Sequence, residues 1–525
     1  MMKNYIFKKK TGTIALMISV FSIFLYRYML TDTGIGYMAC SYLICALVWC
    51  VLGEGLSDVT ARMVRAKLAK GQKNNAMNIL SVSFVNQLVL GIAGAVLCSA
   101  LNFSLMSGMI GLPKGRFLGL YLSAFFFFRM LNEYFYGYVS VSSGERAIGI
   151  ASILRELFRV ISGLIFMNMM YDKGVISAAL LMDPDLKYIY AVAGLFIGFS
   201  VSELLIFIFM FIVRLGSRIK SVSDYDSYAI RDNVPRIFFN IWKKRTGSIV
   251  HGMAFCIFMI AAVSRAGDAA VLGLSASALF VPFAISSLVS SYSGTAASVS
   301  WVSTVRKNEK GLARSYFDFG VHIVVIASVF CTAFIASVSK LVNKVLITDP
   351  GVSLTTELIL ITAASIFFSI AHFCDQLCSM RDDRISRIIS DAVSCLAAIL
   401  AVRISSGKDH SFYMAFMISM LVYSVTNMII WCALTYVRMG MVFDPFRNIL
   451  IPVVSGAVTA IFLLLITNAA AAHLGNLFTM VMCIPIGLII YHSVLLLLKN
   501  YTDSELKLMP FGNIIYSLGQ ILKVI

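Results

Sequence analysis

The chain has 525 residues, of which 59% are hydrophobic and only 13% are charged, and its formal net charge is +17. A soluble domain carries about 25% charged residues to cover its surface, so this composition excludes a soluble enzyme or binding module. Many apolar runs approach the ~20 residues that a helix needs to cross a bilayer, which predicts an all-α polytopic membrane protein. These runs are continuous, whereas a transmembrane barrel would show short segments of alternating hydrophobicity.

The N-terminus carries a basic stretch, Lys8 to Lys10, followed by an apolar run. This run is too long for a signal peptide and no small-residue cleavage site follows it, so we predict a retained first membrane helix. Apolar runs separated by polar breaks along the whole chain predict about 14 spanning helices. Their expected ranges are 11–30, 35–56, 77–101, 117–140, 147–170, 188–213, 247–265, 269–298, 317–338, 354–378, 386–404, 411–436, 449–467 and 476–498.

The positions of Lys and Arg predict the orientation of these helices. If the N-terminus is cytoplasmic, most of the 43 Lys and Arg residues fall in cytoplasmic segments, above all between Arg214 and Arg245. An excess of basic residues in short cytoplasmic loops is the pattern that orients membrane helices. We therefore expect a multi-pass protein of the cytoplasmic (inner) membrane with both termini in the cytoplasm. The same pattern accounts for the positive charge without any nucleic-acid partner.

The spacing of polar segments predicts the domain organisation. The basic segment 214–246 is expected to be a cytoplasmic linker between two six-helix lobes at 1–213 and 247–440. Helices thirteen and fourteen then occupy 441–500. The last segment, 501–525, is too short and too polar to span, and its apolar residues share one helical face. This pattern predicts an amphipathic helix that lies in the membrane interface.

The two lobes look alike when the sequence is shifted by about 238 residues. Arg27 then falls on Arg265, Gly36 falls near Gly273, and the basic loop that ends at Gly71 falls near Gly311. Two repeats that both start on the cytoplasmic side are related by an axis along the membrane normal. Transporters use such repeats to form a midplane cavity that opens alternately to either side, so the repeat predicts two pseudo-symmetric lobes around a substrate path.

A set of short segments carries a resemblance to one family: Gly34-Ile35-Gly36-Tyr37, Gly55-Leu56-Ser57, Ala61-Arg62, Lys70-Gly71, Glu156-x-x-Arg159 and Pro282. In these segments and in its architecture the whole chain resembles the multidrug/oligosaccharidyl-lipid/polysaccharide (MOP) exporter superfamily. The resemblance is to its polysaccharide and lipid-linked-sugar flippase branches, and fourteen helices favour these over the multidrug antiporters, which usually have twelve. Glu54 departs from the family, which usually has a neutral residue there.

Ionisable residues inside the predicted spans are the candidate site residues, because a central Arg costs about 2.5–3.5 kcal/mol to insert. Arg129 lies near the middle of helix four, and Glu133 follows one turn later on the same face. Two interpretations stay open. Either the pair lines a water-filled cavity, or it neutralises itself as an internal ion pair within the bundle.

Four further arginines extend this candidate substrate cavity. Arg27 and Arg265 lie near the outer ends of helices one and seven, at equivalent places in the two repeats. They either snorkel to the outer interface or face each other across the cavity, where a guanidinium would bind a lipid diphosphate through paired hydrogen bonds. Arg155 and Arg159 are one turn apart on helix five and either extend the basic lining or anchor the cytoplasmic helix end.

Other residues suggest coupling and motion. Asp375 and Asp391 flank the loop between helices ten and eleven, and they are either a cation site for coupling H+ or Na+ or solvated loop-end carboxylates. Pro282 interrupts the backbone hydrogen bonds of a long helix and is a candidate hinge. His372, Cys374 and Cys378 lack the further ligands that a metal site needs, so no metal is predicted.

Enzyme functions fit the sequence poorly. A membrane glycan polymerase or glycosyltransferase needs a sizeable outer loop with catalytic side chains. The largest predicted outer loops, 170–187 and 340–357, carry scattered aspartates without a catalytic pattern. A Gly-rich phosphate-binding loop is also missing, so ATP hydrolysis is not expected. The sequence therefore predicts a transporter that is not an enzyme and has no cofactor.

The predicted function is a flippase or exporter that moves a lipid-linked, anionic glycan precursor across the cytoplasmic membrane by alternating access. The glycan would serve polysaccharide or cell-envelope biosynthesis. Expected partners are this lipid-linked glycan, membrane lipids, glycan-assembly proteins and a coupling H+ or Na+. The alternatives are a multidrug/cation antiporter of the same superfamily and, from a different class, a membrane glycan polymerase or glycosyltransferase.

Reporter fusions test the predicted number of spans. A fusion after Leu474 should report an outside position and a fusion after Lys499 an inside position, because the fourteenth predicted helix lies between them. The measurement uses a reporter that is active on only one side of the membrane. An outside signal after Lys499 would exclude fourteen spans with both termini in the cytoplasm.

Overall fold

The computed structural model describes residues 2–142, 145–217, 234–279, 310–346, 355–380, 384–405, 412–502, 505–506, 509 and 512–522. Every regular element within these residues is a helix, and nine of the described helices are long and apolar enough to cross a membrane, or ten if one bent pair counts as a span. The chain is therefore an all-α polytopic membrane protein, as predicted. The full count of fourteen spans stays a prediction.

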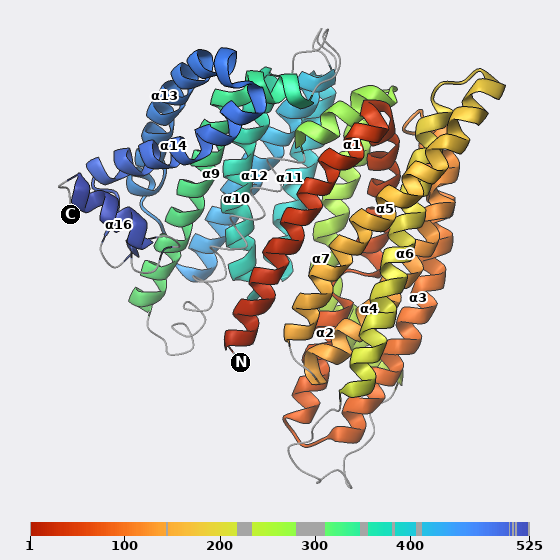
Figure 1. The fold of residues 1–525 in the computed structure, drawn as a ribbon. Helices are drawn as coiled ribbons and strands as arrows, with labels where there is room; N and C mark the ends of the chain where they lie inside the picture. The colour runs from red at the N-terminus through yellow and green to blue at the C-terminus, as the bar shows by residue number, and fades with distance from the viewer. Residues whose placement is uncertain are drawn as a thin grey trace. The chain divides into compact units, whose positions relative to one another are not determined.

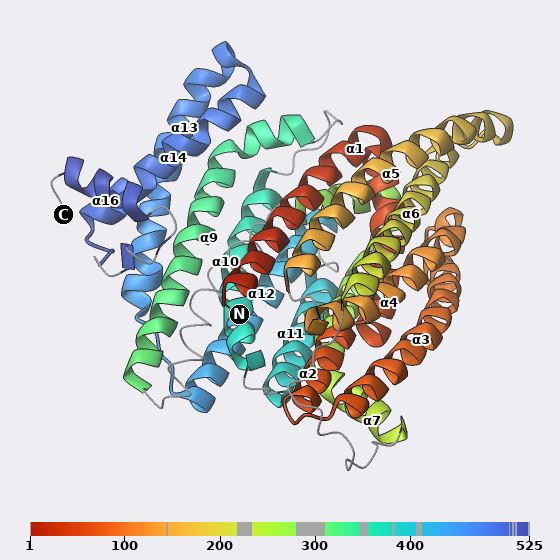
Figure 2. The same cartoon turned by 60° about the horizontal axis from the view of Figure 1, so that its bottom comes forward.

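The chain divides into two compact units, Met1–Ser277 and Ala278–Ile525. The helices of the first unit are α1 (Met2–Leu52), α2 (Leu56–Leu68), α3 (Lys73–Gly108), η1 (Pro113–Phe117), α4 (Leu118–Ser142), α5 (Glu145–Leu181), α6 (Leu186–Gly216), α7 (Val234–Val263) and a short helix, Ala269–Leu279. Within this unit α4 packs against α3 and α6, and α5 lies along α6 (Figures 1 and 2). These packed helices form the frame that holds the candidate site.

Helix α1 contains two of the predicted spans. Its backbone breaks at Thr31, where φ is 54°, a left-handed value that a β-branched residue rarely adopts. The break falls between the first predicted span, which ends at 30, and the second, which starts at 35. The two halves of α1 therefore meet at a kink and not at an open loop.

Two predicted loops differ from the structure. The loop expected at 170–187 is largely helical, because α5 continues to Leu181. Helix-compatible residues fill most of this stretch, and the helix stops where Met182 takes a left-handed φ of 53°, two residues before Pro184. Part of the predicted linker, 218–233, lies outside the described residues, and the remainder from Val234 belongs to α7. The predicted division into lobes stays a prediction.

A close helix crossing links the start of the second half of α1 to the helix Ala269–Leu279. A Cβ atom at Gly36 would lie 1.9 Å from the carbonyl oxygen of Ala269, and one at Gly273 would lie 1.8 Å from that of Asp32. Gly36 and Gly273 are 237 residues apart, as are Asp32 and Ala269. If each residue is replaced by its counterpart 237 residues away, one contact becomes the other. A two-fold axis through the crossing would produce this relation.

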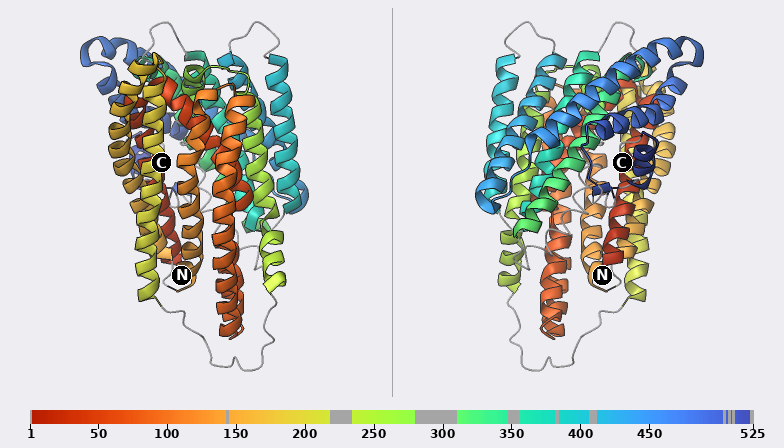
Figure 3. Two further views of the ribbon diagram at one scale, coloured as in Figure 1. Left: turned by 90° about the vertical axis from the view of Figure 1, so that its right-hand side faces the viewer. Right: turned by 90° about the vertical axis from the view of Figure 1, so that its left-hand side faces the viewer.

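The helices of the second unit are α9 (Lys310–Leu346), α10 (Thr355–Met380), α11 (Arg384–Ser405), α12 (Phe412–Met439), η2 (Phe446–Leu450), α13 (Ile451–Leu474), α14 (Asn476–Leu497) and α16 (Gly512–Ile521). α10 packs on α9 and α12, while α13 and α14 pack on each other and on α9 (Figure 3). Phe317, Phe373, Trp431 and Tyr491 belong to its main apolar core. α16 lies in the segment predicted to be an amphipathic helix, and it buries Ile515 while it exposes Ile514.

Substitutions at the glycine crossing test its tightness. Gly36→Ala and Gly273→Ala should each lower the thermal unfolding midpoint of the detergent-solubilised protein, because a methyl group would overlap a backbone carbonyl. Overpacking of this kind costs about 1–3 kcal/mol. Gly12→Ala is the matched control, since no atom lies within 4 Å of the added Cβ. Unchanged midpoints for both crossing variants would contradict the close contact.

Candidate functional site

A buried carboxylate on α6 is the centre of the polar network in the first unit. The side chain of Glu203 is 0% exposed. Its Oε1 accepts hydrogen bonds from Nη1 of Arg129 on α4 at 3.4 Å and from Nη2 of Arg159 on α5 at 3.2 Å. Nδ2 of Asn132 donates to Oε2 at 2.8 Å. Three donors from two other helices therefore compensate one charge that the apolar interior would otherwise exclude.

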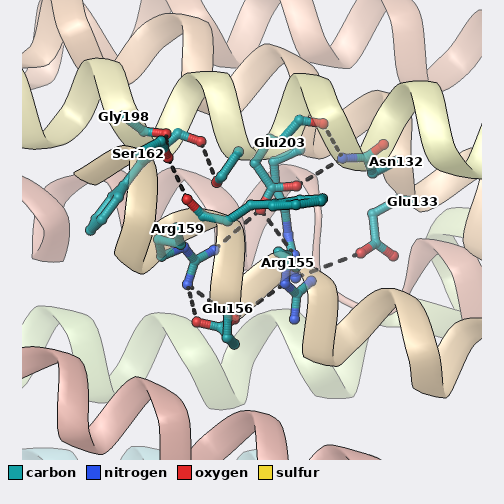
Figure 4. A network of polar contacts seen from close by, with 12 residues as sticks. Asn132, Glu133, Arg155, Glu156, Arg159, Ser162, Gly198 and Glu203 are labelled. Atoms are coloured by element: carbon teal, nitrogen blue, oxygen red, sulfur yellow. Dashed lines mark hydrogen bonds and ion pairs between the residues drawn. The ribbon is translucent and has the colours of Figure 1, made fainter. Parts of the chain in front are cut away.

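Two more glutamates complete the network (Figure 4). On α5, Glu156 accepts from Nε of Arg155 at 3.3 Å and from Nη1 of Arg159 at 3.1 Å. On α4, Glu133 lies one turn after Arg129, with 4.0 Å between the nearest nitrogen and oxygen. The spacings of three and four residues place all these side chains on the inner faces of α4 and α5. Three guanidinium groups therefore face three carboxylates.

Aromatic rings surround the guanidinium groups. The guanidinium carbon of Arg129 lies 5.0 Å from the ring centre of Trp49, and that of Arg159 lies 5.3 Å from Phe199 and 5.7 Å from Phe125. Such contacts attract a cation electrostatically through the ring face and stabilise it by about 2 kcal/mol when both partners are desolvated. α1 thereby joins the helices that hold the network, since it carries Trp49.

A polar cavity of about 220 Å³ adjoins the network. Its lining comes from α2, α4 and α5: Ser57, Asp58, Arg129, Glu133, Tyr136, Ser140, Ile148, Ser152 and Arg155. The volume is sufficient for several water molecules, and the hydroxyl and carboxylate groups offer them partners. The predicted lining residues Arg129, Glu133 and Arg155 thus share one cavity, whereas Arg159 reaches Glu203 deeper in the unit.

The remaining predicted residues of the first unit lie apart from this network. Arg27 is buried and forms an ion pair with Asp32, which directly follows the kink at Thr31. Arg265 is exposed, in the turn between α7 and the helix Ala269–Leu279. Neither arginine lines the polar cavity. Their predicted role in binding substrate stays a prediction.

In the second unit, the two aspartates occupy different surroundings. Asp375 on α10 accepts hydrogen bonds from Nε of Arg387 on α11 at 2.7 Å, and Nη2 of the same guanidinium lies equally close. Asp391 is fully buried on α11. Neither is a solvated loop-end carboxylate. Their role in ion coupling stays a prediction, and Pro282 lies outside the described residues.

Glu203 and Asn132 were not among the residues that the sequence singled out. The signal was present, because Glu203 is the only acid in the long apolar run from Ala191 to Val213. An acid inside a span needs a compensating partner as much as an arginine does. Asn132 carries no charge and gives no comparable signal.

Substitution of the glutamates tests how the network is held together. Glu203→Gln should lower the free energy of unfolding by about 3–5 kcal/mol, because it leaves Arg129 and Arg159 without their shared buried carboxylate. Glu133→Gln should cost clearly less, since the one ion pair that Glu133 forms with the described residues is at 4.0 Å. Thermal unfolding of both variants in one detergent checks this order. Equal losses of stability would contradict the central role of Glu203.

Comparison with known proteins identifies which solved structures share the fold of the chain. No family model and no curated protein sequence matches the chain. Among solved structures, the chain is similar to an inward-facing multidrug resistance MATE family transporter of the MOP superfamily, with a TM-score of 0.64 and 13% identity. That match covers 83% of this chain and 98% of the other.

Two further structures extend the comparison. The lipid II flippase MurJ in an inward closed conformation has a TM-score of 0.62 and 13% identity, and the match covers 94% of this chain and 96% of MurJ. A MOP superfamily transporter from Pyrococcus furiosus has a TM-score of 0.57 and 14% identity, over 84% of this chain and 96% of that one. The chain therefore has the fold of the MOP superfamily transporters, as the sequence resemblance predicts.

Proposed function

We propose that this protein is a flippase that moves a lipid-linked, anionic glycan precursor from the cytoplasmic to the outer leaflet by alternating access. The observation that carries the proposal is an apolar cavity of about 440 Å³ between α9, α14 and α16. A multidrug exporter that binds a small amphiphile in a central cavity does not need such a cavity beside its terminal helices. A transporter whose substrate has a long hydrocarbon chain does need a place for that chain.

The chemistry of this cavity suits a hydrocarbon chain. Its lining includes Phe330 on α9, Leu488 and Tyr491 on α14, and Ile515 and Leu518 on α16. A hydrocarbon chain within it would contact mainly apolar side chains, and burial contributes roughly 0.8 kcal/mol per CH₂ group removed from water. We infer that the cavity holds part of the lipid tail while the headgroup crosses.

A polar cluster fixes the segment that bears α16. Glu505 forms an ion pair with Arg447 of η2, and one of its oxygens lies 3.6 Å from Nδ1 of the buried His322 on α9. Burial alone raises the pKa of Glu505, but the neighbouring His322, the hydrogen bond from the Thr502 amide and the nearby Arg447 lower the pKa to about 2. The carboxylate therefore stays ionised at neutral pH. The segment between α14 and α16 is thereby held against α9 and η2.

The headgroup site belongs to the arginines of the first unit in this proposal. Arg129 and Arg155 line the polar cavity, and Arg159 lies behind them. Guanidinium groups bind phosphate oxygens through paired hydrogen bonds, which suits a diphosphate. Arg27 and Arg265 are proposed as further contacts of the headgroup during transport. Asp375 and Asp391 are proposed as the coupling-ion residues, and the protein is proposed to lie in the cytoplasmic membrane with both termini inside.

The second candidate is a multidrug exporter of the same fold. The balance of three arginines by three glutamates supports it, because a neutral network does not by itself select an anion. The similarity to the MATE transporter covers 83% of the chain, and the similarity to MurJ covers 94%. The larger share covered by the flippase match, together with the apolar cavity, favours the lipid-linked substrate.

Flipping in proteoliposomes tests the proposed function. The purified full-length chain is reconstituted with a fluorescent polyprenyl-diphosphate sugar, and a membrane-impermeant quencher reports the label that has crossed. We expect protein-dependent crossing of this probe and no uptake of a cationic dye. Leu488→Trp fills the apolar cavity and should slow the crossing about tenfold, equivalent to about 1.4 kcal/mol. Leu465→Trp, an exposed position on α13, is the matched control and should leave the rate unchanged.

The alternatives give different results in the same assay. Uptake of the cationic dye without crossing of the lipid probe would support the multidrug exporter and overturn the flippase. Crossing that is equally fast in Leu488→Trp and in the control would show that the apolar cavity does not hold the tail. Equal crossing of long and short prenyl chains would lead to the same conclusion.

A further inference from the structure

We propose that Glu133 and the polar cavity beside it form a proton-binding site that water reaches from the surface of the first unit. The site lies in a different unit from Asp375 and Asp391, the coupling-ion candidates considered above. Three observations carry the proposal: the weak compensation of Glu133, an unsatisfied hydroxyl in the cavity, and the charges that line it.

Glu133 is the least compensated of the three network carboxylates. Glu203 accepts from two arginines and Asn132, and Glu156 accepts from two arginines. Glu133 has a single guanidinium at 4.0 Å and the hydroxyl of Ser57 as its other polar neighbour, and that guanidinium, on Arg129, lies closer to Glu203 at 3.4 Å. Nearby positive charges and hydrogen-bond donors stabilise the ionised form of a carboxylate, so a carboxylate with fewer of them loses less stabilisation when it is protonated. Glu133 is therefore the member of the network that accepts a proton most easily.

The cavity contains a polar group that calls for a ligand. Tyr136 lines it and is only 8% exposed, yet its hydroxyl has no hydrogen-bond partner among the described residues. Ser57, Ser140 and Ser152 line the same space. A buried hydroxyl without a protein partner indicates bound water where the space is polar and large enough, and about 220 Å³ is ample. Water in this cavity would connect Glu133 to the protein surface.

The charges that face Glu133 come from several helices. Arg129 lies on its own helix α4, Arg155 on α5 and Asp58 on α2. Glu54, before α2, and Arg245, on α7, also interact with Glu133 electrostatically, with opposite signs. Arg65 of α2 donates to the Ser140 carbonyl at 3.0 Å, but its side chain is exposed, so solvent screens its charge.

These surroundings favour a proton over a metal ion. The four carboxylates Asp58, Glu133, Glu156 and Glu203 face the three guanidinium groups Arg129, Arg155 and Arg159, so the assembly is one positive charge short. Two of these guanidinium groups line the cavity itself and would repel a metal ion. The described residues also contain no group of three His, Cys, Asp or Glu that could hold one. A proton bound covalently to a carboxylate oxygen supplies the charge without a coordination shell.

Protonation of Glu133 changes what Arg129 can bind. Once Glu133 is neutral, Arg129 keeps only Glu203 as its charged partner, and the cavity becomes less negative. An anionic headgroup then binds the Arg129 and Arg155 edge of the cavity more favourably, so proton and substrate bind with positive coupling. This consequence rests on the proposed function, whereas proton binding by Glu133 does not.

The protein carries a native reporter for this site. Trp49 lies 5.0 Å from the Arg129 guanidinium and donates from Nε1 to Glu54 at 3.2 Å. Indole fluorescence responds to nearby charge. The full-length protein with Trp242, Trp301 and Trp431 changed to Phe retains Trp49 as its single tryptophan, and Glu54→Gln in the same protein removes the carboxylate that contacts the indole directly. Its fluorescence is titrated from pH 4 to pH 9 in detergent without substrate.

We expect one titration in this protein that Glu133→Gln removes. Glu133→Asp should restore a titration with a different midpoint, which shows that a carboxylate at this position is required. Asp58→Asn removes a nearby negative charge and should move the midpoint about one pH unit lower, since ionisation of Glu133 becomes easier. Asp172→Asn, at an exposed position on α5, is the control and should leave the midpoint unchanged. Monodisperse size-exclusion profiles establish that each variant is folded.

Three outcomes would overturn the proposal. The first is a Trp49 titration that persists in the folded Glu133→Gln variant. The second is a fluorescence signal that does not change with pH in the parent. The third is a response to NaCl at constant pH that Glu133→Gln abolishes, which would assign the site to a metal cation. The titration is independent of the flipping assay, so failure of the flippase proposal leaves its result intact.

Discussion

The arrangement of the first unit depends on the compensation of one buried carboxylate. Glu203 is fully inaccessible on α6, and its charge is tolerable there only because Arg129, Arg159 and Asn132 reach it from α4 and α5. Each of these side chains must cross a helix interface to do so. The carboxylate therefore fixes the mutual rotation of three helices more strictly than apolar packing would, because apolar faces can slide while hydrogen bonds from two helices to one carboxylate cannot.

The same network sets a problem for any anionic substrate. All its arginines already have carboxylate partners, so a phosphate that enters must compete with Glu133, Glu156 or Glu203. Glu133 is the partner that is held most weakly and the only one of the three that lines the cavity. Neutralising it is the least costly way to free a guanidinium. In the proposed mechanism, proton binding and binding of an anion are linked through a single side chain.

The second unit uses the opposite chemistry. Its cavity between α9, α14 and α16 is lined mainly by hydrocarbon, and its polar residues are gathered in the cluster of His322, Arg447 and Glu505 at the segment before α16. The cluster holds a short amphipathic helix in place without placing charge in the cavity. The first unit thus has a polar cavity and the second an apolar one.

The sequence by itself determined the membrane-spanning, all-helical fold, because continuous apolar runs are a property of single segments. It also identified the break near Thr31, the α16 segment and the arginines at 129, 155 and 159, each from local pattern and the cost of burying charge. The partners of those arginines were decided only by the tertiary structure. Glu203 is 74 residues from Arg129 and 44 from Arg159, and helical periodicity gives the face of a residue within its own helix but not the neighbour that the face meets. The close approach of Gly36 to Ala269 and the cavity between α9, α14 and α16 likewise arise only when distant helices pack.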